Sequence, residues 1–472
     1  MQTLQENSIL DIISPQVLSV LQFRALCGRL LPHLKTFELW AARGDSIPFI
    51  PLFLSPRTST ITFAFNDRNP PKAVAASMII ALPVLCPDLR RIGLHNIPAD
   101  PTIIASVSDF LLTTNHNALQ YFCADCPLSE EARRVFFKLP NLRELQTIFN
   151  GPTTIPTIVL PNLTEIDIGY DHGHEWLQGF HGASFRKLET VRFHSHSESI
   201  GDFLGAFERV ALTTSIPATL TTFRFHTFEQ WRPNIRSLLP FTQLRTLVIE
   251  FSCELSCSST IDDDSITDLA RAMPMLEALR LGKRPCQIPA GVTSKGLSAL
   301  AHYCLHLSEL CIHFQVDSLD PTGFPISTPA GEPAIPRGDC ALTDLDVGDI
   351  HIPEESTLMA ALVLLRIFPR LKWLEYTDEG WDKVANAIAL SKDLTDYSSK
   401  KHTFAASRRT LMTLPQGLEL CFRAAMKVLP DLSGFIPTFT HFCIPHVTHI
   451  PLPFHWMKRD SMMIVYWSTN DW

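Results

Sequence analysis

Apolar residues recur along most of this chain in one short phrase. An apolar residue is followed by a second three positions later and by a third two positions after that, as in Leu307, Leu310 and Ile312. The last two positions of the phrase alternate with polar residues, which is the pattern of a half-buried β-strand. The chain is therefore expected to contain many short strands of one type.

The phrase returns at a nearly constant interval. The twelve steps from Leu34 to Leu371 average about 28 residues, although individual steps are longer or shorter. About thirteen irregular units result, beginning at Leu34, Thr60, Leu89, Leu119, Leu142, Leu163, Leu188, Leu220, Leu244, Leu276, Leu307, Leu342 and Leu371. A colinear series of this length is not expected by chance from a leucine-rich globular sequence.

Helical spacing precedes the strand phrase in several units. Before Leu307, Thr293 is a suitable helix cap, and Leu297, Leu300 and Cys304 then fall on one helical face. A unit of one strand and one helix cannot bury its apolar face alone, so neighbouring units must stack. The predicted fold is an α/β leucine-rich-repeat solenoid, with a curved parallel sheet inside and helices and irregular turns outside.

The repeat also divides the chain. Residues 1–33 are predicted to be a helical capping segment, and residues 34–380 to be the solenoid, interrupted by a proline-rich insertion at 317–340. Residues 381–472 lack the phrase but keep a high apolar content. They are expected to cap the last repeat, with an unfolded tail as the alternative.

Composition narrows the class of protein. Hydrophobic residues make up 46% of the 472 residues, charged residues 19%, and the net charge is -8, which gives no basic footprint for nucleic acid. The sequence shows neither a basic segment followed by an apolar core at its start nor about 18 uninterrupted apolar residues elsewhere. The twelve cysteines have no framework spacing. We expect reduced thiols, no membrane association, and a cytoplasmic or nuclear location.

The candidate metal ligands have structural explanations. Cys123 and Cys126, like Cys253 and Cys257, have the spacing of half a zinc site, but no second pair lies at a matching distance, and cysteine is often buried. One segment is rich in histidine, but its histidines lack the HExxH spacing of a zinc protease. They are His172, His174, His181, His194 and His196.

A run of three aspartates is the third candidate for a metal site. Asp262, Asp263 and Asp264 stand where a helix is expected to begin, and helix capping is the expected role. No catalytic residue, cofactor or metal is expected, and an enzyme in the last 90 residues is a distant alternative.

Two repeats resemble a known family. The segments SITDLARAMPMLEALRL and VTSKGLSALAHYCLHLSELCI resemble the cysteine-containing leucine-rich repeats of F-box proteins, and LLPHLKTFELW, LPVLCPDLRRIGL and LPNLRELQTIF look like units of the fungal F-box and leucine-rich-repeat group. The resemblance covers roughly residues 15–378. It implies a substrate receptor of an SCF-type ubiquitin ligase, in which the solenoid holds the target.

The F-box itself is not visible in the sequence, so a Skp adaptor and a cullin are expected partners only if an F-box exists upstream. A protein-interaction scaffold without ligase association is the alternative.

The candidate binding residues alternate with the core positions of the strands and should lie on the concave face of the sheet. The acidic side chains of two units give way to basic ones in the next two, and such a charge step can orient a protein partner. The residues predicted to contact that partner are Tyr121, Glu144, Glu165, Asp167, Arg192, His194, Arg224, His226, Glu309 and Trp373.

Overall fold

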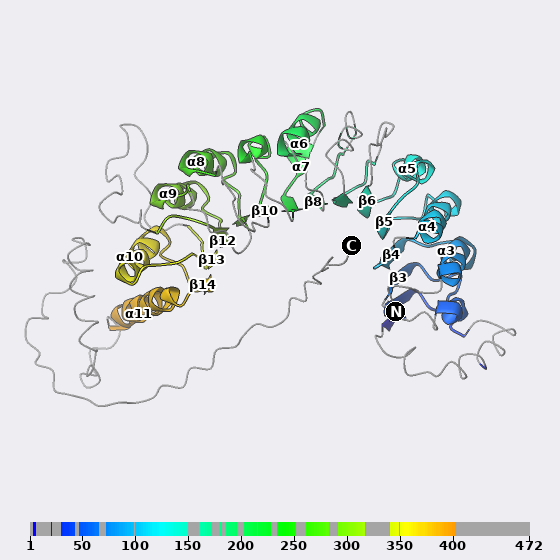
Figure 1. Ribbon diagram of the computed structural model, residues 1–472, viewed down its shortest axis with the longest axis horizontal. Helices are drawn as coiled ribbons and strands as arrows, with labels where there is room; N and C mark the ends of the chain where they lie inside the picture. The colour runs from blue at the N-terminus through cyan, green and yellow to red at the C-terminus, as the bar shows by residue number, and fades with distance from the viewer. Residues whose placement is uncertain are drawn as a thin grey trace, which may run out of the picture. The chain divides into compact units, whose positions relative to one another are not determined.

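A sheet of fourteen strands, hydrogen-bonded to one another in chain order from β1 to β14, is the main feature of the structure (Figure 1). Every pair of neighbouring strands is parallel. The computed structural model describes residues 3–5, 20, 30–42, 47–65, 72–98, 100–149, 160–170, 177, 180, 183, 185–195, 203–214, 216–227, 234–251, 261–282, 291–316, 340–348 and 350–401.

The strands are short, and most begin two positions after the first residue of a predicted unit. They are β1 (Thr3–Gln5), β2 (Thr36–Ala42), β3 (Thr60–Phe65), β4 (Arg91–His95), β5 (Tyr121–Pro127), β6 (Glu144–Phe149), β7 (Glu165–Tyr170), β8 (Thr190–Ser195), β9 (Thr222–Thr227), β10 (Thr246–Phe251), β11 (Ala278–Leu281), β12 (Glu309–Ile312), β13 (Asp344–Gly348) and β14 (Trp373–Tyr376).

Helices pack on one side of the sheet. The α-helices are α3 (Lys72–Leu85), α4 (Pro101–Thr113), α5 (Glu130–Phe136), α6 (Phe203–Ala211), α7 (Ile216–Thr219), α8 (Asp263–Ala272), α9 (Ser294–Tyr303), α10 (Thr357–Ile367) and α11 (Gly380–Lys401), and the 3-10 helices are η1 (Ile47–Leu52), η3 (Ile235–Leu238) and η4 (Glu354–Ser356). Figure 1 shows these helices on the outer side of the stacked repeats and the strands on the inner side.

The strand register confirms the leucine-rich-repeat prediction. Leu279 of β11 is the direct neighbour of Leu247 in β10 and of Leu310 in β12, so equivalent leucines form continuous rows. The leucine at the first position of a unit is buried as well, as Leu244 and Leu276 show. The chain is thus an α/β leucine-rich-repeat solenoid, because each strand can bury its apolar face only against its neighbours.

A backbone hydrogen-bond pattern repeats where the strands begin. The carbonyl of Arg90 accepts the N–H groups of both Gln120 (2.8 Å) and Tyr121 (3.0 Å) of the next repeat. The carbonyl of Arg143 accepts those of Thr164 and Glu165 in the same way. These bonds hold successive strands in register, and so they align the side chains of the opposite face.

Phenylalanine packing supports the middle of the sheet. Phe193 of β8 contacts Phe203 and Phe207 of α6 with ring centroids 5.1 and 5.5 Å apart, and Phe207 stacks on Phe241 at 5.3 Å. All four rings are buried. Strand β8 is therefore backed by a rigid aromatic layer.

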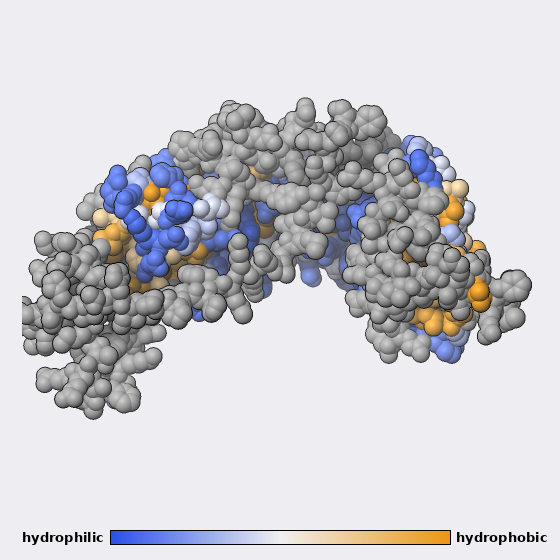
Figure 2. All heavy atoms as spheres, turned by 60° about the horizontal axis from the view of Figure 1, so that its bottom comes forward, coloured by the Kyte–Doolittle hydropathy of each residue, from blue (hydrophilic) through white to orange (hydrophobic). Residues whose placement is uncertain are grey.

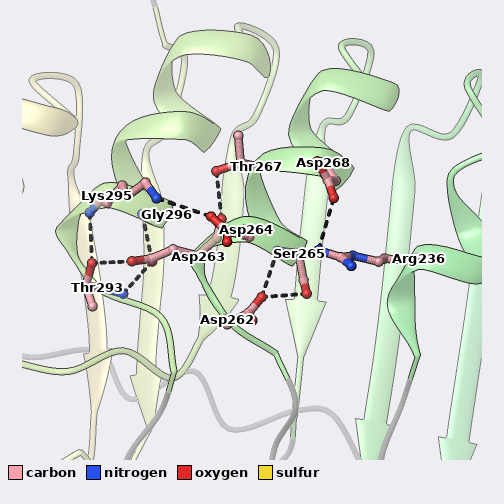
Figure 3. A network of polar contacts seen from close by, with 10 residues as sticks. All are labelled: Arg236, Asp262, Asp263, Asp264, Ser265, Thr267, Asp268, Thr293, Lys295 and Gly296. Atoms are coloured by element: carbon pink, nitrogen blue, oxygen red, sulfur yellow. Dashed lines mark hydrogen bonds and ion pairs between the residues drawn. The ribbon is translucent and has the colours of Figure 1, made fainter. Parts of the chain in front are cut away.

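Polar contacts join α8 to α9 (Figure 3). Thr293, the N-cap of α9, accepts from the N–H of Lys295 (3.2 Å), which confirms the cap predicted for it. The carboxylate of Asp263 accepts the N–H groups of Thr293 (2.7 Å) and Gly296 (2.9 Å). The two helices are thus connected by polar contacts as well as by their apolar faces.

Two structural observations concern the ends of the solenoid. Strand β1 extends the sheet by pairing with β2, within the segment that the sequence predicted to be helical. At the other end, Trp381 at the start of α11 is buried, and its indole Nε1–H donates to the carbonyl oxygen of Ile350 at 2.7 Å. The first turns of α11 are therefore packed against the preceding repeat.

The chain divides into a unit from Met1 to Thr395 and a second unit from Asp396 to Trp472. Of the second unit, only the end of α11 belongs to the described residues. The predicted insertion at 317–340 also lies outside them, apart from Cys340, which is buried.

Candidate binding surface

The concave face is the side of the sheet from which strand side chains point away from the helices. In β7, β8 and β10 every second residue is buried and the intervening ones are partly exposed, so each strand presents alternate side chains on this face. Figure 2 shows hydrophilic side chains on this inner side. The parallel register places these side chains in rows that cross the repeats.

Three of these rows contain all ten predicted partner-binding residues. The strand register places Tyr121, Glu144 and Glu165 in one row, Asp167, Arg192 and Arg224 in the next, and His194 and His226 in the third. The first row also contains Glu309 and Trp373, several strands away on β12 and β14. The structure therefore brings eight of the ten together on β5 to β9.

At one edge of this group, Arg91 of β4 reaches across β5. Its guanidinium lies 4.3 Å from the ring centroid of Tyr121 and donates from Nη1 and Nη2 to the two carboxylate oxygens of Glu144, at 3.3 and 3.2 Å. The planar guanidinium thus makes a bidentate ion pair and a cation–π contact together. Sequence spacing places Arg91 in a neighbouring unit but does not reveal that it passes over Tyr121.

The expected charge step is neutralised where the two signs meet. Arg192 donates to Glu165, and Nε2 of His194 lies 3.1 Å from Oδ1 of Asp167. Both pairs run diagonally from β8 to β7. Glu165 and Arg192 therefore compensate one another, and Asp167 has a histidine beside it, so the step from negative to positive that the sequence suggested is reduced where the two strands meet.

Arg224 on β9 differs from its neighbours. It is exposed, it stands directly beside Arg192 of β8, and on its other side is Val248 of β10. Within the described residues, no acidic group pairs with it. Since Arg192 is already bound to Glu165, Arg224 is left as the uncompensated positive charge in the middle of this surface.

The two histidines of the third row are adjacent to Arg224. The rings of His194 and His226 are 6.0 Å apart between centroids, and Nδ1 of His226 lies 3.5 Å from Oε2 of Glu250. Each histidine therefore has one acidic neighbour: Asp167 on β7 for His194 and Glu250 on β10 for His226.

The C-terminal end of the concave face is acidic. Nη2 of Arg280 lies 3.7 Å from Oε2 of Glu309, but the strands beyond carry Asp344, Asp346 and Glu375. Beside Asp344 in the register is Trp373, whose side chain is 65% exposed. An exposed indole on an acidic surface is a suitable contact for a basic, partly apolar partner segment.

The structure separates the two cysteines of the first half-site. Cys126 belongs to the apolar core, and burial raises the pKa of its thiol to about 12. Cys123 is also buried but lies on the concave side of β5, beside His95 of β4 and Asp125 of β5. Burial, with the charge of Asp125 as the next cause, raises the pKa of Cys123 above its ordinary value.

Sequence reasoning did not identify His95 and Asp125 as possible ligands, because 28 residues separate His95 from Cys123, far more than the spacing of a metal-binding motif. Alternation places Asp125 on the same face of β5 as Cys123, and the regular register of β4 and β5 continues toward His95 and Asp125. The proximity of His95 to Cys123 follows from the register, since the residue two positions before His95 pairs with Cys123.

The three aspartates at the N-terminal end of α8 do not converge on one point. Asp262 caps its own helix by accepting from Ser265 N–H (2.8 Å), Asp263 accepts from α9, and Asp264 pairs with Lys295 at 3.2 Å (Figure 3). This confirms the capping interpretation for Asp262, whereas Asp263 and Asp264 contact residues at the start of α9.

The remaining candidates lie outside the described residues. These are Cys253, Cys257, His172, His174, His181 and His196. None of the helices in the described part of the chain combines the length and apolar character needed to cross a membrane.

Comparison with known proteins adds distant structural likenesses. No protein-family model and no curated protein matches the chain. Among solved structures, a chain of the yeast Rad7 and Elc1 complex is similar at 13% identity over 56% of this chain and 74% of that one, with a TM-score of 0.32.

Two bacterial proteins are similar over more of the chain. The leucine-rich repeat-containing protein LegL7 of Legionella pneumophila is 11% identical over 75% of this chain and 96% of its own, with a TM-score of 0.33. A leucine-rich-repeat protein of Leptospira interrogans is 14% identical over 75% and 81%, with a TM-score of 0.31. This chain is of the leucine-rich-repeat type, as its own strand register shows.

Proposed function

We propose that this chain is a protein-recognition subunit that binds a partner protein on its concave face. The observation that carries the proposal is the exposed Arg224, which lacks a compensating acid among the described residues while its neighbours Arg192, His194 and His226 each have one. An unpaired positive charge beside neighbours whose charges are paired favours binding of an oppositely charged group.

The size of the surface favours a protein over a small metabolite. Fourteen strands spaced about 4.8 Å apart give a sheet on the order of 60 Å across, which matches an extended polypeptide or a folded domain. Aromatic residues such as Tyr121 and Trp373 lie on it and can act as anchors, since aromatic and arginine side chains dominate binding energy at protein interfaces.

The charge distribution gives the partner a preferred direction. An acidic segment of the partner would lie over Arg224, and a basic segment over Asp344, Glu375 and the exposed Trp373. Opposite charges at the two positions raise the association rate and disfavour the reversed orientation.

The test of the surface is Arg224→Glu in the full-length chain, tagged and purified from native cells with its bound proteins. Recovery of the main partner should fall by about tenfold or more, which corresponds to roughly 1.4 kcal/mol. The thermal unfolding temperature should not change, because the described residues offer Arg224 no partner to lose.

Arg134→Glu is the matched control. Arg134 is an exposed arginine on α5, on the helical side, with a single surface ion pair to Glu130. This variant should retain the partner. If Arg224→Glu retains the partner as well as Arg134→Glu does, the binding site lies elsewhere.

A finer proposal is that the chain is the substrate-recognition subunit of an SCF-type ubiquitin ligase, acting in the cytoplasm or nucleus. It is supported by the resemblance of the repeats that contain α8 and α9 to those of F-box proteins, with Gly296, Leu297 and Cys304 in the matching positions. The purification above distinguishes it from a scaffold without ligase association. A Skp adaptor and a cullin recovered with the partner support the ligase role, and a partner recovered without them supports the scaffold.

A further inference from the structure

Three potential metal ligands meet on the concave side of β4 and β5, apart from Arg224. His95 ends β4, whereas Cys123 and Asp125 lie on β5, and one ligand atom of each falls within 4.8 Å of the other two. Sγ of Cys123 and Oδ2 of Asp125 each lie 3.6 Å from Nδ1 of His95. Sulfur, nitrogen and oxygen donors therefore surround one small volume.

The spacing fits one tetrahedral ion. Zinc binds sulfur at about 2.3 Å and imidazole nitrogen at about 2.0 Å, so a tetrahedral site separates these two ligand atoms by about 3.5 Å. The observed 3.6 Å between Cys123 Sγ and His95 Nδ1 agrees with this value, and because Sγ also lies 3.9 Å from Nε2, the imidazole must turn about its Cβ–Cγ bond to direct Nδ1 at the ion. The equal distance to Asp125 is slightly wider than the tetrahedral value and needs only a small rotation of the carboxylate.

Neighbouring residues hold the ligands in place. Asn96 has a left-handed backbone with φ of 54°, and its N–H donates to Oδ2 of Asp125 at 3.1 Å. Gly93 lies beside the imidazole of His95. Any other residue at position 93 would place its Cβ atom only 3.1 Å from Nε2 of His95. Supporting contacts of this kind orient the ligands of metal sites.

The same atoms do not form a cysteine–histidine–aspartate catalytic triad. In a triad the aspartate and the nucleophile contact different ring nitrogens, so that the ring passes a proton between them. Here the Cys123 thiol lies 3.6 Å from Nδ1 and 3.9 Å from Nε2, and the Asp125 carboxylate lies 3.6 Å from Nδ1, so the ring does not stand between the thiol and the carboxylate. The three donors instead face one small volume.

We propose that His95, Cys123 and Asp125 bind a zinc ion, with a water molecule in the fourth tetrahedral position. A thiolate and an imidazole select zinc over calcium and magnesium, which prefer oxygen ligands. The thiol proton passes to solvent when the metal binds. Cys123 is buried, but the side chains of His95 and Asp125 are 22% and 33% exposed, and they provide the path by which the ion enters.

Cobalt titration of the metal-free, full-length chain tests the site. Co²⁺ replaces zinc in tetrahedral sites and gives a thiolate-to-cobalt absorption band in the near ultraviolet. We expect the band to saturate and zinc then to remove it. Cys123→Ser should remove one equivalent of the band. It should also weaken zinc binding by more than about a hundredfold, which is more than the loss of an outer supporting contact costs. Competition with a chromophoric chelator measures the zinc affinity.

Cys311→Ser is the matched control, because Cys311 lies on β12 in the same row of the concave face as Cys123. It should keep both the band and the zinc affinity. His95→Gln removes a ligand without changing a buried thiol, so it provides the same test if Cys123→Ser lowers stability. The proposal is overturned if the unaltered chain gives no band, or if Cys123→Ser and His95→Gln bind zinc as the unaltered chain does.

Discussion

The carboxylate of Asp263 in α8 caps the helix of the following repeat through Thr293. Its Oδ1 accepts the N–H of Thr293 at 2.7 Å, its Oδ2 accepts the Thr293 hydroxyl at 2.6 Å, and Oδ1 also accepts the N–H of Gly296 at 2.9 Å. A Cβ atom on Gly296 would lie 2.6 Å from Oδ1, so glycine allows this approach. Solenoid stability is largely a sum of such nearest-neighbour terms.

Asp263→Ala should therefore destabilise the solenoid by about 2–3 kcal/mol. The change removes a charged acceptor and leaves the first N–H groups of α9 without their partner. Urea unfolding followed by circular dichroism measures the loss as a lower transition midpoint.

The adjacent Asp264→Ala serves as control. Asp264 and its partner Lys295 are 72% and 66% exposed, so their ion pair is worth less than about 1 kcal/mol. If Asp263→Ala and Asp264→Ala lower the free energy of unfolding equally, the hydrogen bonds from Asp263 to α9 do not stabilise the solenoid more than a surface ion pair does.

Acid should weaken the cap made by Asp262. Hydrogen bonds from the Ser265 hydroxyl (2.6 Å) and from its backbone N–H (2.8 Å) hold the pKa of Asp262 below its ordinary 3.8. A carboxyl whose pKa is lower in the folded chain stabilises the fold above its unfolded pKa, and this contribution is lost as the pH falls through the folded pKa.

Asp262→Asn keeps a capping side chain but cannot ionise. The unaltered chain should be more stable than this variant at pH 7, and the difference should shrink at pH 3, measured by urea midpoints at each pH. A difference that stays constant between the two values would contradict the ionic contribution.

Trp381→Phe tests the packing of α11 on the repeat before it. The indole is fully buried, donates to the carbonyl of Ile350 and lies edge-on to Phe314 at 6.1 Å. Removing the donor and part of the ring should cost about 1–3 kcal/mol in the free energy of unfolding.

The same substitution at Trp373, which is 65% exposed, should change stability by less than about 0.5 kcal/mol. A similar cost at the two positions in chemical denaturation would mean that the indole of Trp381 is not an important contact.

Helix caps and strand positions could be read from the sequence because they depend on neighbours a few residues away. Asp262 and Thr293 each cap the helix that they precede, as predicted. The contact from Asp263 to α9 could not be predicted, since its partners lie about 30 residues further along the chain.

The candidate binding surface was likewise predictable from the sequence only in part. Alternation placed Glu165, Arg192 and Arg224 on one face, but pairing depends on how far each side chain reaches across the strands. Arg192 turns back to Glu165, whereas the next row position, Arg224, finds no acid among the described residues. Which arginine is available was thus a property of the folded sheet.

The sequence by itself determined the repeated strand, its buried leucines and the parallel solenoid, because one apolar phrase recurring about every 28 residues can be buried only by stacking. Tertiary structure alone decided which charges neutralise one another and which donors meet around Cys123. Those relationships depend on strand register and on side-chain reach, which join residues that are distant in the chain.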